Sequence, residues 1–158
     1  MPKVLDQYDL KILTLLQKNA KMDVKALAKA VHLSESPVRS RKKVLESTYI
    51  KSNNAILHKD LFNINIIGHA LIKFKNSSSA AMARTKKMII EMPFILRCAT
   101  TTGDFDLAVT IGASDMNAFT KITTKDILQD GNVEHLYTYL EITELKDGTT
   151  IDLTNFLH

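Results

Sequence analysis

Apolar residues recur at helical spacing along the first fifth of the chain. Between residues 7 and 18 they form a broad stripe that follows Asp6. A second stripe, over residues 24–31, follows Asp23 and has its apolar positions at i, i+3, i+4 and i+7. An aspartate in front of such a stripe is a typical N-cap, because its carboxylate accepts a free backbone N–H. The pattern predicts two short amphipathic helices.

A third predicted helix has two chemically different faces. It starts after Ser34 and carries Pro37 in its first turn, where no helical hydrogen bond is lost. On a wheel of about 100° per residue, Val38 and Leu45 fall on one side. The opposite side presents hydroxyls and cations: Ser36, Arg39, Ser40, Lys43 and Ser47. Helix, tight turn and basic helix together predict a helix-turn-helix whose last helix enters the major groove of DNA.

Not every cation of this helix has the same expected role. Arg41 flanks the packed side of the wheel, and we expect it to be partly buried and structural. Lys42 also lies toward the packed side and is a weaker candidate for a phosphate contact. The predicted DNA-contacting set is therefore Ser36, Pro37, Arg39, Ser40, Lys42 and Lys43. A basic helix facing solvent on an ordinary domain is the simpler alternative for the charge run taken alone.

The region after the third helix has a weaker pattern. Ile50, Ala55 and Ile56 with polar neighbours predict one or two short strands, a small wing beside the helices. Residues 57–66 show no strong periodicity and are interpreted as a linker. The chain is thus divided into a winged helix-turn-helix domain at 1–56, the linker, a second domain at 67–153 and a tail at 154–158.

The second domain alternates between strand and helix patterns. A period of two is visible around residues 70–74, 105–111 and 136–142, and residues 95–102 are rich in β-branched side chains and strand-like. Helical spacing over 81–92 and after Asp115 separates these strands, and Asp147-Gly148 leads into a possible edge strand at 149–153. The order β-α-β-β-α-β predicts an α+β ferredoxin-like sandwich, a four-stranded antiparallel sheet with both helices on one face.

The other face of this sheet is too apolar to be left in water. It would carry His69, Leu71, Lys73, Tyr137 and Tyr139. Pairing with the same face of a second copy would bury these side chains. We therefore expect a dimer formed through this domain.

Charge is distributed unevenly along the 158 residues. The net charge is +4, but residues 1–58 carry +6 and residues 59–158 carry −2. This concentrates positive potential on the helix-turn-helix, as expected for a head that binds double-stranded DNA. With one cysteine, Cys98, no apolar leader and no long apolar run, the sequence favours a cytoplasmic, nucleoid-associated protein.

The sequence shows none of the common signatures of an enzyme. The histidines and Cys98 lack metal-ligand spacing, and there is no phosphate loop, nucleophile elbow or dinucleotide fingerprint. We therefore expect no catalytic residues, no metal and no cofactor.

The clearest candidate for a small-molecule site is the turn between the second and third predicted strands. Thr101, Thr102, Gly103, Asp104, Phe105 and Asp106 make up this turn. Gly103 permits close approach of the backbone, and Asp104 or Asp106 could receive an ammonium group. A plain β-turn explains the same residues, because turns favour Gly and Asp.

Three stretches together resemble the Lrp/AsnC (feast/famine, leucine-responsive) transcription regulators. They are LDQYDLKILTLLQKNAKMDVKALAKAVHLSESPVRSRKKVLE at the start, TTGDFDLAV in the middle and NVEHLYTYLEITELK near the end. The resemblance covers the chain from Leu5 to about Leu153. It implies a winged helix-turn-helix head and a ferredoxin-like effector domain that dimerises, often forms octamers and often binds an amino acid near the glycine-aspartate turn.

The chain departs from the pattern of that family at three places. His32 stands where a glycine is usual, and the glycine expected before the wing is missing. The last strand has Leu136 and Thr138 where the family commonly has two threonines, so Thr138 is the remaining effector candidate there.

Three functions stay open at this point. The first is a sequence-preferring transcription regulator modulated by an amino acid or a related small metabolite at the oligomer interface. The second is an effector-free architectural DNA binder of the same fold. The third, much less favoured, is a sensing or enzymatic ferredoxin-like domain whose head binds a protein.

Overall fold

The computed structural model describes residues 4–75, 78–146 and 150–153. The chain divides into two compact units, one formed by residues 1–56 with 145–158 and the other by residues 57–144. Each unit has its own hydrophobic core. Among the described residues, no helix combines the length and the apolar character needed to cross a membrane.

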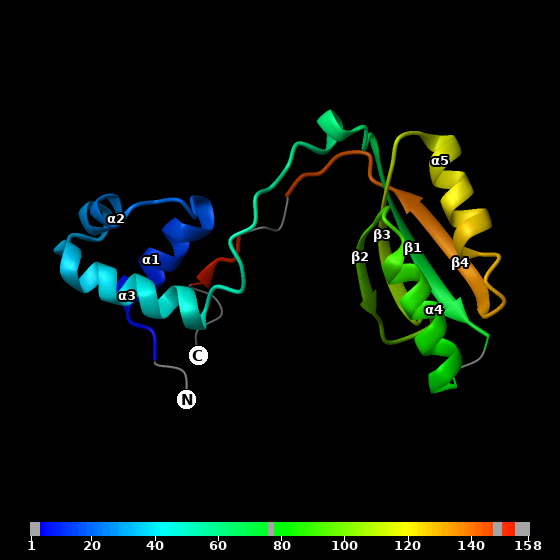
Figure 1. Cartoon of the computed structure of the whole chain (residues 1–158), viewed down its shortest axis with the longest axis horizontal. Coiled ribbons are helices and arrows are strands. Elements are labelled where there is room, and N and C mark those ends of the chain that lie inside the picture. Colours follow the sequence, from blue (N-terminus) through cyan, green and yellow to red (C-terminus); the bar gives the residue numbers. More distant parts are fainter. Residues whose placement is uncertain (1–3, 76–77, 147–149, 154–158) are drawn as a thin grey trace. The chain divides into compact units, whose positions relative to one another are not determined.

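The first unit contains the three predicted helices (Figure 1): α1 (Gln7–Lys18), α2 (Val24–Val31) and α3 (Glu35–Thr48). Asp6 caps α1 by accepting the N–H groups of Tyr8 and Asp9, each at 2.9 Å. Asp23 caps α2 by accepting the Ala26 N–H at 2.7 Å. The buried apolar side chains all belong to the predicted stripes: Ile12, Leu13, Leu16, Leu27, Ala28, Val31, Val38 and Leu45.

The predicted wing is absent from the described part of the chain. Residues 51–58 form neither strand nor helix, and every one of them is exposed. A single turn of 3-10 helix, η1 (Lys59–Phe62), follows them. The prediction was wrong because this stretch pairs with no other strand among the described residues, and a strand without a partner is not stable.

The second unit has the predicted α+β order (Figure 1). Its elements are β1 (Ile66–Phe74), α4 (Ser79–Glu91), β2 (Ile95–Thr100), β3 (Leu107–Ala113), α5 (Met116–Lys121), which continues as the π-helical turn η2 (Ile122–Ile127), and β4 (Val133–Leu140). The strand order is β2-β3-β1-β4 and every pair is antiparallel. This is the ferredoxin-like sheet that the sequence predicted.

Both helices of this unit cover the same face of the sheet. Ile89 of α4 and Phe119 of α5 share one core with Ala70, Ile72 and Val109 of the strands. Their burial leaves the alternate strand positions on the opposite face, as the period of two requires.

The end of the chain differs from the expectation. Residues 150–153 form no strand and lie with the first unit, where Ile151 is hydrogen-bonded to Gln17 of α1. A fifth strand would have to pair with an edge of the sheet, and this segment pairs with a side-chain amide instead. The expected turn at Asp147-Gly148 and the residue Thr149 lie outside the described residues.

Candidate functional site

The outer face of α3 carries five of the predicted DNA-contacting residues. Ser36, Pro37, Arg39, Ser40 and Lys43 are all exposed, while Val38 and Leu45 on the same helix are buried. The inner face is fixed by apolar packing, so the outer face is rigidly presented. Within the helix, the Ser40 hydroxyl donates to the carbonyl of Ser36 at 3.3 Å.

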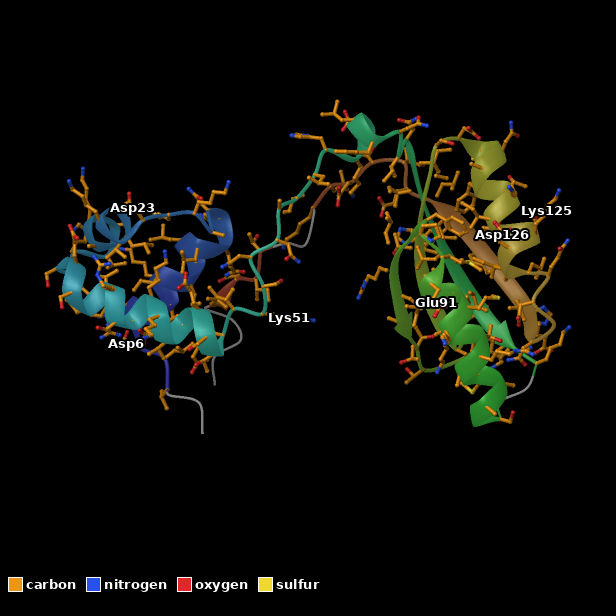
Figure 2. The ribbon with its side chains drawn as sticks, viewed as in Figure 1. Asp6, Asp23, Lys51, Glu91, Lys125 and Asp126 are labelled. Atoms are coloured by element: carbon orange, nitrogen blue, oxygen red, sulfur yellow. The ribbon has the colours of Figure 1, made fainter. Side chains whose placement is uncertain are left out.

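Arg41 faces the opposite way and ties α3 to the start of α1. Its Nη1 lies 2.6 Å from Oδ2 of Asp6 and 2.6 Å from Oδ1 of Asp9. Asp6 lies beside α3 in Figure 2, and the guanidinium of Arg41 also sits over the ring of Tyr8, 5.8 Å from its centroid. These two carboxylates raise the pKa of Arg41, the hydrogen bond to Asp9 having the larger effect. Arg41 is therefore structural, as its wheel position indicated.

Lys42 is also engaged within the head. Its ammonium donates to the carbonyl of Met22 at 3.0 Å and lies 3.7 Å from the carboxylate of Glu46. Its side chain is only 19% exposed. A phosphate contact by Lys42 would have to replace these bonds, so the structure favours Arg39 and Lys43 over it.

The turn between α2 and α3 depends on a left-handed residue. His32 has φ 57° and ψ 44°, and its N–H closes the end of α2. This is the conformation for which glycine is the usual residue, because a side chain crowds the backbone there. The left-handed end of α2 is thus formed by His32, which stands where the resembled family has glycine.

The sequence did not reveal the buried role of Asp9. This carboxylate is 1% exposed, accepts the Asp6 N–H at 3.3 Å and meets Arg41. The pair Asp6–Asp9 forms a capping box, in which each side chain accepts the N–H of the other residue. The spacing Asp-x-x-Asp before an apolar stripe was the signal that could have found it.

The glycine-aspartate turn is closed by its own residues. The Thr101 hydroxyl donates to the Phe105 carbonyl at 2.6 Å, and Gly103 has φ 95° with open space around it. Oδ2 of Asp106 accepts the N–H of Phe74 at 2.9 Å. Thr102 and Asp104 are exposed. Of the two aspartates proposed to receive an ammonium, Asp104 is the one whose carboxylate faces solvent.

Thr138 is not brought to this turn within one chain. It lies on β4 opposite Ala70, whereas the turn leads into β3 on the other side of β1. The turn meets β1 near its end, where Asp106 donates its N–H to the Ile72 carbonyl at 2.9 Å. The candidate effector residues therefore form one cluster, at the turn, and one separate position.

The uncovered face of the sheet is aromatic and only partly shielded. The rings of His69 and Tyr139 stack with centroids 4.8 Å apart, and Tyr137 and Tyr139 lie 6.5 Å apart. His69 also lies 2.8 Å from Glu141. Tyr137 is 60% and Tyr139 48% exposed, so this face remains available for another surface.

The described residues contain no cluster that could hold a metal ion. Cys98 is only partly exposed, and burial raises the pKa of its thiol. A raised pKa leaves less thiolate at neutral pH, which agrees with Cys98 as a packing residue.

Comparison with known protein families gives a match in each unit. Residues 5–46 match the AsnC-type helix-turn-helix domain, and residues 69–151 match the Lrp/AsnC ligand binding domain. The second match alone spans more than half of the chain.

Curated relatives and solved structures agree with these matches. The chain is 32% identical to the HTH-type transcriptional regulator FL11 of Pyrococcus furiosus, over 75% of this chain and 80% of that protein. It is 30% identical to the leucine-responsive regulatory protein of Haemophilus influenzae, over 98% and 90%. A transcriptional regulator of Neisseria meningitidis, solved as a complex with L-methionine, superposes with a TM-score of 0.89 at 27% identity and covers 97% of this chain and 99% of its own.

Proposed function

The chain belongs to the Lrp/AsnC family of DNA-binding transcriptional regulators, and we propose that the outer face of its helix α3 reads the major groove. Arg39 and Lys43 are the main contacts, through base edges or phosphates. Ser36, Pro37 and Ser40 form the close-packed surface between them. The protein is a regulator rather than an enzyme, as its family and its relatives' names indicate.

The division of the cations of α3 is the observation that supports this proposal. Arg41 and Lys42 are bonded to groups of the head, while Arg39 and Lys43 extend from the exposed face. A helix that binds DNA needs both kinds of cation, one that fixes the helix within the head and one that contacts the DNA.

The test is DNA binding by Arg39→Ala and Lys43→Ala, with Lys42→Ala as the matched control on the same helix. Each of the first two should weaken binding to a selected DNA site by about 1–3 kcal/mol if it reads a base. A pure phosphate contact should instead lower the slope of log affinity against log salt by about one. Unchanged affinity and slope in both variants would refute the assignment of this face.

We further propose that the aromatic face of the sheet pairs with the same face of a second copy. His69, Tyr137 and Tyr139 supply apolar and stacking surface, and like faces can pair about a two-fold axis. The dimer presents two heads, so its DNA site is a rough palindrome with half-sites one helical turn apart or a multiple of it. Tyr137→Asp should dissociate the dimer, as measured by sedimentation. Association of dimers into octamers would require a second interface.

The effector we propose is an amino acid bound near the 101–106 turn. Asp104 offers an exposed carboxylate to the ammonium, and Thr102 and Gly103 offer polar and backbone contacts. The L-methionine complex of the similar Neisseria regulator supports this class of ligand. Thr138 joins the site only if a second protomer brings another surface to it.

A thermal melt with each of the twenty amino acids tests the effector. A ligand at 100 times its dissociation constant stabilises the folded state by about 2.7 kcal/mol. The shift should disappear in Asp104→Asn, which keeps the size of the side chain and removes its charge. If no amino acid raises the melting temperature, the turn has only a structural role.

One observation favours the second candidate, an architectural DNA binder without an effector. Thr101 and Asp106, two of the polar residues of the turn, already bond to Phe105 and Phe74. Competition with random DNA separates the two functions: a specificity ratio near one indicates an architectural protein, and about 10³ or more indicates a regulator.

A further inference from the structure

The last described residues of the chain are attached to the helix-turn-helix unit. The side chain of Gln17 on α1 pairs with both backbone groups of Ile151: its Nε2 donates to the Ile151 carbonyl at 3.1 Å, and its Oε1 accepts the Ile151 N–H at 2.7 Å. Leu153 packs against the core of the three helices. This pairing joins residues that are 134 positions apart in the sequence.

The same segment follows the last strand of the sheet, β4, which ends at Leu140. The N–H of Glu141, just after β4, donates to the Ile67 carbonyl at 2.9 Å. Glu144 lies 3.8 Å from Lys59. The two units are therefore joined twice along the chain, once where the first unit ends at Ile56 and once where it resumes at Leu145.

We propose that residues 150–153 act as a C-terminal clasp that positions the DNA-binding head, with Gln17 and Leu153 as its positioning residues on the two sides of the contact. Two connections limit the movement of the head more than one does. The clasp thereby sets the spacing of half-sites that the dimer accepts. This inference rests on the proposed dimeric DNA binding and adds its spacing specificity.

The lengths involved make the effect measurable. A single flexible connection of the length of residues 51–58 has a root-mean-square span of roughly 15 Å. Half a helical turn of DNA is about 17 Å long. Such a move also turns the half-site to the opposite face of the duplex. A head held by that connection alone can adjust to this change far more freely than a head held at two points.

The sharpest variants change the backbone bond and leave the helices alone. Ile151→Pro removes the N–H that Gln17 accepts. Ile151→Ala is its matched control, because it keeps both backbone groups and trims a side chain that is 56% exposed. Gln17→Ala removes the same contact from the other side, with the exposed neighbour Lys18→Ala as its control.

The experiment measures affinity of the full-length dimer for paired half-sites at the preferred spacing, for pairs moved apart by half a turn, and for a single half-site. The unchanged protein and both controls should bind the pairs at the preferred spacing about tenfold or more tightly than the pairs moved apart by half a turn. Ile151→Pro and Gln17→Ala should reduce this preference to less than about threefold, with single-half-site affinity unchanged.

Other outcomes overturn the inference. A preference unchanged in both clasp variants would show that one connection positions the head. Loss of single-half-site binding with melting of the head would show that the segment only stabilises it. If the unchanged protein does not bind paired sites, the dimeric DNA-binding proposal itself fails.

If the unchanged protein does not bind paired sites, a measurement without DNA still tests whether the clasp limits the movement of the head. Spin labels at exposed Lys25 in the head and Lys125 in the second unit report the distribution of distances between the units. Ile151→Pro should broaden this distribution relative to Ile151→Ala, and equal widths would contradict the clasp.

Discussion

Replacing Arg41 by alanine should destabilise the head, whereas replacing Arg39 should not. The two arginines are two positions apart on α3, so they share helix, residue type and change in charge. Arg41 meets Asp6 and Asp9 at 2.6 Å, while Arg39 is exposed. Comparing the variants Arg41→Ala and Arg39→Ala therefore separates the structural role of a cation from its role in DNA binding.

The magnitude follows from the exposure of the two carboxylates. The side chain of Asp6 is 42% exposed, so its ion pair contributes about 0.2–1 kcal/mol after screening. The side chain of Asp9 is 2% exposed. Removing the charged partner of a buried carboxylate costs about 3–5 kcal/mol in general, and the Asp6 N–H still bonds to Asp9. We expect Arg41→Ala to cost about 2–4 kcal/mol in total.

Such a loss is large for a domain of this size. A unit of some fifty residues has about 3–8 kcal/mol of stability in all. Arg39→Ala, a surface change on the same helix, should stay within about 0.5 kcal/mol.

Hydrogen exchange of the α1 and α3 amides in the full-length protein measures the opening of the head alone. Exchange should accelerate by roughly 30- to 700-fold in Arg41→Ala, the equivalent of 2–4 kcal/mol, and stay nearly constant in Arg39→Ala. DNA affinity should fall in Arg39→Ala although its head stays closed. Exchange rates that match in the two variants would refute the assignment of Arg41 as the tie between α1 and α3.

The same contact gives the head a pH dependence of known sign. The N–H of Asp9, and then the guanidinium of Arg41, lower the pKa of Asp6 in the folded head. A folded pKa below the unfolded value of about 3.9 contributes stability above that value, which is lost as the pH falls through the folded pKa. Helical circular dichroism of the head should therefore weaken below about pH 4, and the dependence should be shallower in Arg41→Ala. A steeper dependence in the variant would contradict this reasoning.

Three further substitutions test single contacts by thermal or urea unfolding. His32→Gly should raise the stability of the head by about 0.5–1 kcal/mol, because glycine adopts φ 57° without a side-chain penalty; a loss would refute the strain. Gly68→Ala should cost about 1–3 kcal/mol, since the new Cβ would lie 2.2 Å from Cε2 of the buried Phe119 ring; Phe119→Leu in the same chain should recover part of it. Asp106→Ala should lower the free energy of unfolding by about 1–3 kcal/mol by removing the acceptor of the Phe74 N–H. An unchanged stability would mean that this bond contributes little and that Asp106 is available to bind a ligand.

The helices, the strands and the faces that they bury could be predicted from local pattern. Helical spacing and the capping aspartates at positions 6 and 23 defined the helices, and the period of two gave the βαββαβ order. These are local properties: a side chain at i, i+3 or i+4 shares a face whatever lies beyond it. The division of α3 into buried Val38 and exposed Arg39 followed from the same rule.

Contacts between residues far apart in the sequence could not be predicted from local pattern. No periodicity shows that Arg41 reaches Asp9 or that Asp106 accepts the N–H of Phe74, because each bond joins positions 32 apart. The expected wing and the expected fifth strand failed for the same reason: a strand exists only where a partner offers free backbone groups. The backbone of Ile151 pairs instead with the side-chain amide of Gln17, 134 positions away, and no local pattern can locate such a contact.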